Sequence, residues 1–380
     1  MNRISKSMVS IFIGLSVFQG TAVPQKAFAQ EAAGERASST IEKYVPQQLL
    51  KLMHAPEVQK ELGLSSVQTT SLEQLFSQRD GDWFRSRNLP EEKQRALVSL
   101  LEQEVQQWLA KNGTEKQQLR AKQLEMRAQG VRMLLRSDVK SRLKLDANQQ
   151  SKLLALIDAH IAAVQQLATA TKQEKDTKEL TAAAQQAAQA EQAAFAEVLR
   201  PEQQQQLAAL VGPAFDTTKL ERIYPMAPEL VWASDWINSS PLTLQQLRGK
   251  VVVVHFYAFQ CINCQRNLPH YAKWFKDFGQ EDLVIIGIQT PETPAERDIT
   301  KVREAAKNEK IEYPVMVDLE SKNWANWSNT MWPTVYVIDR NGYLRQWWQG
   351  ELNWKGASGE QKFHDLIERL IAEPLHKSAG

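Results

Sequence analysis

The two cysteines of this chain, Cys261 and Cys264, are separated only by Ile262 and Asn263. On a helix, side chains at this spacing lie on neighbouring turns, so the two sulfurs can close and open a disulfide. A loop this short constrains the unfolded chain very little, which argues against a stabilising cross-link. The spacing therefore predicts thiol-disulfide exchange, in which one thiolate attacks a disulfide and the second sulfur resolves the mixed disulfide.

The residues on either side of the pair predict the elements that position it. Residues 251–257 are almost wholly apolar, which is typical of a central strand covered on both faces. Apolar residues then recur at helical spacing between 265 and 278, so Cys261 is expected at a helix N-terminus. Free backbone N–H groups at such a terminus stabilise a thiolate. We therefore expect Cys261 to be the exposed nucleophile and Cys264, one turn further in, to be the resolving thiol.

A second element is expected to face the cysteines. Trp332 and Pro333 directly precede a β-branched run at 335–338, and residues 339–342 predict a turn into a hairpin strand at 343–349. A proline just ahead of a strand is a candidate for a cis peptide bond. We expect Pro333 to be cis and to lie opposite the cysteine pair.

The composition of the chain changes near residue 213. Residues 39–215 are rich in Gln, Ala, Leu, Glu and Lys, which favours helices, whereas nine of the eleven tryptophans follow this stretch. Short β-branched runs then appear at 251–257, 283–289, 315–318 and 335–338. We therefore predict two domains, an all-α helical domain over residues 30–213 and an α/β domain over residues 214–380.

The helical region contains an internal repeat of the form Leu-x-x-x-Gln. Residues 57–76 align without gaps on residues 138–157, and a third copy has Pro201 at its expected first helical position. Ser65 and Asp146 each stand three residues before a glutamine, which is the arrangement of a helix capping box. The pattern resembles the repeats of the Spy and CpxP group of exported chaperones and stress sensors. Capping and leucines at helical spacing also explain it without any function, and both interpretations stay open.

Residues 1–29 have the features of a cleaved export signal. Two basic residues precede an apolar stretch at 8–18, and Ala27-Phe28-Ala29 fits a small-residue cleavage site. We expect cleavage near Ala29 and a periplasmic or secreted product. The 46 basic and 44 acidic residues of the chain nearly balance, which gives nucleic-acid binding no support.

Several motifs between residues 227 and 354 carry a family resemblance. They are Ala227-Pro228-Glu229-Leu230, Leu247-Arg248-Gly249-Lys250-Val251, the Cys-Ile-Asn-Cys site with Leu268-Pro269, Thr290-Pro291-Glu292, Tyr313-Pro314-Val315 and Trp332-Pro333. Together they resemble the thioredoxin fold, and more closely its exported TlpA and DipZ-like branch. The resemblance implies a central mixed sheet flanked by helices, with the nucleophile on Cys261, the resolving cysteine on Cys264 and the cis proline on Pro333. It also implies that the backbone of Trp332 pairs with the substrate strand.

Two positions depart from that family's pattern. Thioredoxins and the DipZ group have a buried Asp where this chain has His255, and that acid takes the proton of the resolving cysteine. His255 would serve as a neutral base, since imidazole titrates near neutrality. It fits equally well a buried histidine with one hydrogen-bonded nitrogen. Asn267 stands near the place where the TlpA branch often has Glu, so proton transfer is expected to be altered.

The resemblance implies an exported thiol-disulfide oxidoreductase, a reductase or isomerase, that acts on protein disulfides. We expect no cofactor beyond the redox-active disulfide of Cys261 with Cys264, and no metal, because two cysteines are too few for a structural zinc site. A separate membrane electron donor of the DsbD or CcdA type is implied. The alternative is a periplasmic chaperone or partner-binding protein in which the redox domain is accessory. In either case the helical domain is expected to bind clients or to mediate homodimerisation.

Overall fold

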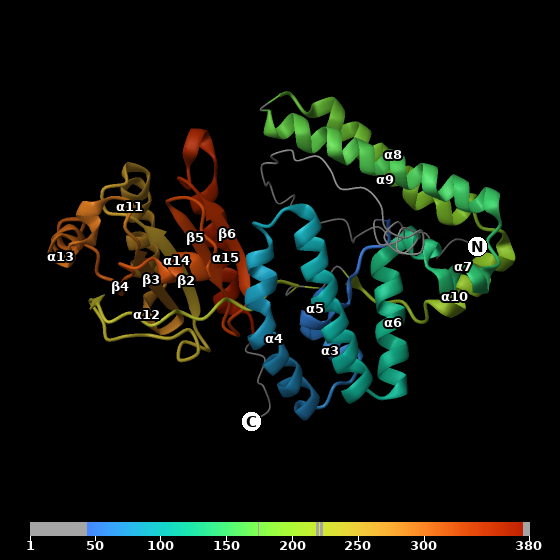
Figure 1. The fold of residues 1–380 in the computed structure, drawn as a ribbon, viewed down its shortest axis with the longest axis horizontal. Helices are drawn as coiled ribbons and strands as arrows, with labels where there is room; N and C mark the ends of the chain where they lie inside the picture. Colours follow the sequence, from blue (N-terminus) through green and yellow to red (C-terminus); the bar gives the residue numbers. More distant parts are fainter. Residues whose placement is uncertain (1–43, 174, 218–219, 221–222, 375–380) are drawn as a thin grey trace, which may run out of the picture. The chain divides into compact units, whose positions relative to one another are not determined.

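The chain divides into two compact units (Figure 1). The computed structural model describes residues 44–173, 175–217, 220 and 223–374. The first unit comprises the described residues within Met1–Leu64 and Ser99–Glu221, and the second those within Ser65–Val98 and Arg222–Gly380. The predicted domain boundary near residue 213 stays a prediction. The two compact units differ from the predicted domains in one respect, because residues 65–98 pack with the second unit.

The described residues of the first unit form helices joined by loops, with no strand among them. Its helices are α2 (Leu49–His54), α3 (Pro56–Glu61), the C-terminal part of α5 (Glu91–Asn112), α6 (Glu115–Gln129), the 3-10 helix η1 (Gly130–Leu135), α7 (Ser137–Leu143), α8 (Ala147–Lys172), α9 (Lys178–Glu197) and α10 (Pro201–Leu210). Met133 and Leu134 of η1 are fully buried in one apolar cluster with Leu153 and Ile157 of α8. This confirms the prediction that the Gln- and Ala-rich region is helical.

Side-chain caps begin the repeat helices, as predicted. Ser65 accepts a hydrogen bond from the Gln68 N–H at the start of α4 (Ser66–Ser86), and Asp146 accepts one from the Gln149 N–H at the start of α8. In both boxes the glutamine side chain accepts a bond from the backbone N–H of the capping residue. Each box thus satisfies two backbone donors that the helix itself leaves without a partner.

The repeat glutamines also join the second and third copies. The Gln149 side-chain amide donates to Gln203 Oε1 at 2.8 Å, and the Gln203 amide donates to the Leu143 carbonyl at 2.9 Å. Pro201 is the first residue of α10, as predicted. The repeat therefore has a packing role in this unit, and its resemblance to the Spy and CpxP group stays a prediction.

Helices α8 and α9 lie side by side as a hairpin (Figure 1). A buried polar cluster joins this hairpin to η1. Glu191 of α9 accepts a hydrogen bond from Arg132 Nε at 2.7 Å and lies 2.6 Å from Nδ1 of His160 on α8. Among the described residues, one segment, Ala147–Thr171, is long and apolar enough to cross a membrane by length and composition. It is the α8 arm of this hairpin. The predicted export signal over residues 1–29 lies outside the described residues.

The second unit contains a six-stranded mixed sheet of order β1-β4-β3-β2-β5-β6. The central strands β2, β3 and β4 are parallel, whereas β1, β5 and β6 pair antiparallel with their neighbours. The strands are β1 (Trp236–Ile237), β2 (Val251–Tyr257), β3 (Leu283–Gln289), β4 (Val315–Val317), β5 (Thr334–Ile338) and β6 (Leu344–Gln349). The helices are α4, the N-terminal part of α5, α11 (Ile262–Asp277), α12 (Gly279–Asp282), η3 (Pro294–Arg297), α13 (Ile299–Asn308), α14 (Lys322–Asn326), η4 (Trp354–Gly356) and α15 (Gly359–Ala372). This confirms the predicted mixed sheet flanked by helices.

Alternate side chains of β2 are buried in two different cores, because successive residues of a strand point to opposite faces. Val253 and Tyr257 belong to a cluster with Trp274 of α11 and Phe363 of α15. Val254, between them, belongs to the cluster on the other face. The whole of β2 is buried, which matches the apolar run in the sequence.

Helix α4 completes the second of these cores, although the sequence places it in the predicted helical region 30–213. Phe84 packs edge-on against Trp327 and Tyr336, with ring centroids 6.0 and 5.7 Å apart. The Arg87 guanidinium lies 3.6 Å from the centre of the Phe84 ring and donates to the Trp327 carbonyl and to Tyr336 Oη. Asp80 accepts a bond from the Met226 N–H at 2.7 Å. Residues distant in sequence thus tie α4 to the sheet of the second unit.

Candidate active site

Cys261 stands at the N-cap of α11, directly after the turn that follows β2. Its backbone is extended, with φ −75° and ψ 110°, and its Sγ accepts a hydrogen bond from the Cys264 N–H at 3.3 Å. The prediction that a helix begins at the cysteine pair is therefore confirmed. Both cysteines are free thiols, with Cys261 half-buried and Cys264 1% exposed.

The two thiols differ in acidity. The pKa of Cys261 is lowered to about 7 by the hydrogen bond from the Cys264 thiol and by the backbone N–H groups of Cys264 and Asn263, against the opposing effects of burial and of the Glu292 charge. The pKa of Cys264 is raised, mainly by burial and then by its neighbour Cys261. Near neutral pH a large share of Cys261 is therefore thiolate, whereas Cys264 keeps its proton.

Trp332 and Pro333 lie at the same edge of the sheet as the cysteine pair. The Trp332–Pro333 peptide bond is cis, as predicted. The register of β2 against β5 pairs Phe256 with Thr334, so the residues that follow β2 and those that precede β5 meet there. Cys261 and Trp332 both pack against the apolar cluster that contains Cys264. The sequence-predicted nucleophile, resolving thiol and proline segment are thus brought together.

The Trp332 ring is held from two sides. Its Nε1 donates to the Thr290 carbonyl at 3.2 Å, and its plane stacks on Trp324 with ring centroids 3.9 Å apart. Trp324 lies in α14, a few residues after the buried Asp318. The Asp318 carboxylate accepts hydrogen bonds from the Trp324 N–H at 3.0 Å and from the Thr290 hydroxyl at 3.3 Å. These contacts fix the segment that leads into Pro333.

His255 lies on the same face of β2 as Tyr257 but is enclosed by tyrosines. Its Nε2 lies 3.1 Å from Tyr313 Oη, and its ring stacks on Tyr271 at 4.1 Å. Nδ1 has no hydrogen-bond partner among the described residues. Burial lowers the pKa of His255 to about 3, so the imidazole is neutral at physiological pH. No hydrogen bond between this ring and Cys264 is found in the described part of the chain.

The cross-strand neighbour of His255 leaves room for the imidazole. Gly287 of β3 is its register partner, and a Cβ at Gly287 would lie 3.0 Å from His255 Nε2. A larger residue there would require the ring to move. A role of His255 in proton transfer stays a prediction.

Asn267 connects the cysteine helix to the loop that follows β6. Its side chain is buried, donates to the Gly350 carbonyl at 3.1 Å and accepts the Leu352 N–H at 3.0 Å. The Gly350 N–H in turn donates to the Pro333 carbonyl at 2.8 Å. From the sequence, Asn267 was notable only because related proteins often have Glu nearby. In the structure its amide positions the loop after β6 through both its donor and its acceptor.

Glu296 is a buried residue that the sequence reasoning missed. Its carboxylate accepts the Gln260 N–H at 2.7 Å through one oxygen, and the N–H groups of Glu292 and Thr293 at 2.7 and 2.9 Å through the other. It thereby ties the residue before Cys261 to the loop after β3. The Thr293-x-x-Glu296 pattern, a capping box, was the available signal.

The described residues contain no group of three or more His, Cys, Asp or Glu side chains placed to hold a metal ion. The reactive groups gathered at this sheet edge are two thiols, and the donors around them are backbone N–H groups. The expectation that the protein uses neither metal nor separate cofactor stays a prediction.

Comparison with known proteins finds similarities in the region that holds this site. Residues 227–347 match the AhpC/TSA family. The chain is 39% identical to protein DipZ of Mycobacterium bovis over 122 residues. This aligned stretch covers 31% of this chain and 18% of DipZ. Thiol-disulfide oxidoreductase YkuV of Bacillus subtilis is 29% identical over 147 residues, which cover 38% of this chain and 94% of YkuV.

A thiol-disulfide isomerase of known structure from Corynebacterium glutamicum shares 22% identity with a TM-score of 0.35, over 39% of this chain and 98% of that one. The chain spans less than a fifth of the length of DipZ, at 18%. The similarity therefore concerns the domain that holds the cysteine pair. The second unit thus contains a thioredoxin-like domain, and this domain is similar to thiol-disulfide oxidoreductases.

Proposed function

We propose that this protein is an exported thiol-disulfide oxidoreductase that reduces or isomerises protein disulfides through Cys261 and Cys264. The asymmetry of the two thiols carries the proposal. Cys261 is half-buried and has a pKa of about 7, whereas Cys264 is buried with a raised pKa. An accessible thiolate beside an enclosed, protonated thiol is the arrangement that a two-step exchange requires.

The reaction proceeds in two balanced steps. The Cys261 thiolate attacks one sulfur of the substrate disulfide, forms a mixed disulfide and releases the other substrate sulfur as a thiolate, which takes up a proton. Cys264 then loses its proton, and its sulfur attacks Cys261 Sγ and releases the second substrate thiolate. The substrate gains two electrons, and the protein is left with a Cys261–Cys264 disulfide. In isomerisation, a substrate thiolate resolves the mixed disulfide instead, and no net electrons are transferred.

The second step needs an acceptor for the Cys264 proton. His255 is proposed for this role because its imidazole is neutral and Nδ1 has no described partner. Tyr271 stacks on His255, and the charge of Cys264 contributes to the raised pKa of Tyr271, after burial. Tyr257 meets the same two criteria, so both tyrosines neighbour His255 and Cys264.

Repeated turnover needs a source of electrons. A separate membrane donor of the DsbD or CcdA type is proposed to reduce the Cys261–Cys264 disulfide. Export rests on the signal pattern over residues 1–29, and periplasmic or secreted localisation follows from it. Protein disulfides are the proposed substrates.

Two cysteine variants test the proposal. Cys261→Ser should abolish the reduction of insulin disulfides, because the attacking thiolate is lost. Cys264→Ser should accumulate a mixed disulfide between Cys261 and the substrate, which mass spectrometry detects, because the resolving thiol is lost. Insulin reduction by the Cys261→Ser protein would overturn the proposal.

Client binding by the helical region is the second candidate function. The apolar segment Ala147–Thr171 favours it, because only 22% of its most apolar window is buried. The full chain carrying both Cys261→Ser and Cys264→Ser separates this function from redox chemistry. That protein should still suppress the aggregation of a reduced, unfolded client. Aggregation at the rate of the client alone would exclude this candidate.

A further inference from the structure

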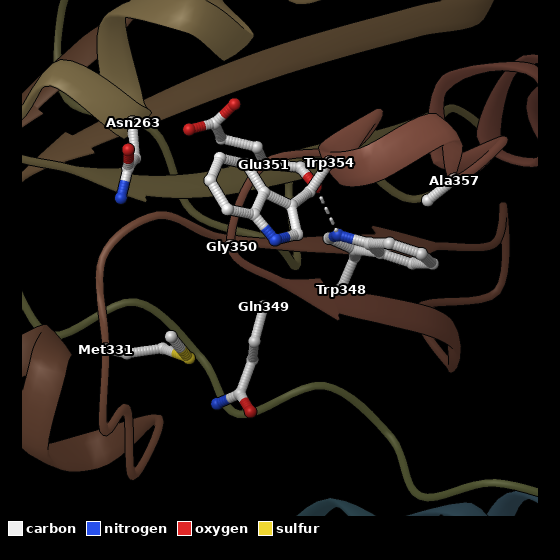
Figure 2. A pocket seen from close by; sticks show the side chains of 8 residues that line it. All are labelled: Asn263, Met331, Trp348, Gln349, Gly350, Glu351, Trp354 and Ala357. Carbon is white, nitrogen blue, oxygen red and sulfur yellow. Dashed lines mark hydrogen bonds between the residues drawn. The ribbon is translucent and has the colours of Figure 1, made fainter. Parts of the chain in front are cut away.

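A cavity of about 350 Å³ is lined by residues from the segments that form the candidate active site. Asn263, which separates the two cysteines, lines it, and so does Met331, which comes just before Trp332 and Pro333. Figure 2 shows these two side chains at one side of the cavity and the indoles of Trp348 and Trp354 across from them. The cavity is therefore bordered by the cysteine turn and by the segment that leads into the cis proline.

The surface of the cavity is mainly apolar. Trp348 Nε1 donates to the Glu351 carbonyl at 3.0 Å, so the polar edge of this indole is satisfied and its carbon face is left to the cavity (Figure 2). Trp354 and Met331 are 54% and 43% exposed, and Ile262, next to Cys261, is 56% exposed. Large apolar side chains exposed together, in contrast to scattered ones, mark a surface that binds a partner.

The charge at the cavity is already compensated. Glu351 is the charged side chain among the lining residues, and Arg266 of α11 pairs with it at 2.7 Å. A cationic occupant would have to compete with this pair, and an anionic one would meet the carboxylate. The cavity therefore suits an uncharged side chain.

The same bonds that fix the active site fix the cavity wall. Gly350 is held by Asn267 of the cysteine helix and by the Pro333 carbonyl, with its backbone at φ +89°, a conformation that favours glycine. The wall is thus set relative to both the cysteine helix and the cis proline before a substrate arrives. Such pre-organisation lowers the entropic cost of binding.

We propose that this cavity is a specificity pocket that receives an aromatic or large aliphatic side chain of the substrate, close in sequence to the cysteine that Cys261 attacks. The inference rests on the proposed oxidoreductase function and names its substrate class. Enclosing such a side chain should raise kcat/KM by about ten- to a hundredfold over a small polar residue at the same position.

Synthetic peptides test the pocket. Each peptide carries one cysteine linked to glutathione as a mixed disulfide, with Phe or Ser placed in turn at each of the three positions on either side of that cysteine. The reduced full-length protein is the reductant, and the ratio of kcat/KM for Phe over Ser is the readout. At one or more positions the ratio should reach about ten.

Two tryptophan variants assign the preference to the cavity. Trp354→Ala should bring the ratio close to one, because the aromatic wall is lost. Trp232→Ala is the matched control, since this residue is 73% exposed in the same unit and does not line the cavity. It should keep the wild-type ratio. Because both peptides of a pair carry the same mixed disulfide, a general loss of activity cancels in the ratio.

The outcomes separate the two proposals. If the wild-type protein reduces neither the peptides nor a small aromatic disulfide such as dithiobis(nitrobenzoate), the oxidoreductase proposal fails. If it reduces the Phe and Ser peptides equally well at every position, or if Trp354→Ala keeps the preference, only the pocket proposal is overturned.

Discussion

His160 in the first unit and His255 in the second are both buried, yet their surroundings are opposite. His160 lies 2.6 Å from the Glu191 carboxylate, which also accepts two hydrogen bonds from Arg132 at 2.7 and 3.0 Å. The His255 ring lies against the rings of three tyrosines, and burial lowers its pKa to about 3. His160 thus lies in a buried cluster whose charges are paired, whereas the surroundings of His255 disfavour a charged imidazole.

The difference shows where chemistry can take place. In the first unit, burial would raise the pKa of Glu191, but the bonds from His160 and Arg132 lower it overall, so the carboxylate stays charged and paired. The region around His255 holds a neutral base and, on the same face, a protonated Cys264. A neutral base with one ring nitrogen free of hydrogen bonds can accept a proton, whereas the groups of the first cluster are already paired with one another.

Breaking the charged cluster should have the largest effect on stability. Glu191→Gln leaves Arg132 and His160 buried without their carboxylate, so we expect the free energy of unfolding to fall by about 3 kcal/mol. Urea denaturation measures it. Glu91→Gln is the matched control, because its partner Arg95 and Glu91 itself are exposed on the surface of α5. Equal effects of the two substitutions would show that the buried cluster contributes nothing special.

A buried carboxylate of the second unit offers the next test. Glu296→Gln removes charge from an acceptor of three backbone N–H groups, so we expect a loss of about 2 kcal/mol. The amide of Gln260 should exchange with solvent faster, because its acceptor is weakened, and hydrogen exchange measures this. Glu292→Gln, an exposed change in the same loop, should leave that exchange rate unaltered. Unchanged protection of Gln260 in the Glu296→Gln protein would refute the positioning role.

The local parts of the second unit were predictable from sequence. The strand Val251–Tyr257 and the helix start at Cys261 follow from an apolar run and from helical periodicity, both of which are local signals. The cis bond at Pro333 follows from a proline ahead of a strand. These are features that neighbouring residues determine.

The contacts that depend on distant residues were not predictable. Phe84 and Arg87 lie in a helical stretch by composition, and only tertiary packing shows that they complete the core beside Trp327. The bonds from Asn267 to the loop after β6 likewise join residues more than 80 positions apart. Periodicity reports which face of an element is apolar, but it does not report which surface that face will cover.

The pH dependence of stability should distinguish the two regions. The pKa of His255 is about 3 in the folded protein, below its ordinary value of 6.5. Between these two pH values His255 is protonated in the unfolded chain but not in the folded protein. Stability is therefore lost as pH falls from about 6.5 towards 3, by up to about 1.4 kcal/mol at pH 5.5. The pKa of Glu191 is lowered from 4.5, so its contribution is lost only at lower pH.

Removing the imidazole tests this assignment. His255→Asn should flatten the decline in the free energy of unfolding between pH 7 and pH 5.5, as measured by urea denaturation with tryptophan fluorescence. His364→Asn, which leaves His255 in place, should keep the wild-type slope. A decline that persists in the His255→Asn protein would mean that another group titrates in this window.

The smallest expected effect concerns Glu292, an exposed acid whose charge acts on the Cys261 thiol. Glu292 raises the pKa of Cys261 through its negative charge, against the bonds that lower it. Glu292→Gln should therefore lower the pKa of this thiol by a few tenths of a unit, because the carboxylate is exposed and water screens it. Alkylation by iodoacetamide at pH 6.5 should be about 1.5 times faster than in the wild-type protein. Glu312→Gln, another exposed acid of the second unit, should leave the rate unchanged. A slower reaction of the Glu292→Gln protein would contradict the inference that the Glu292 carboxylate disfavours the Cys261 thiolate.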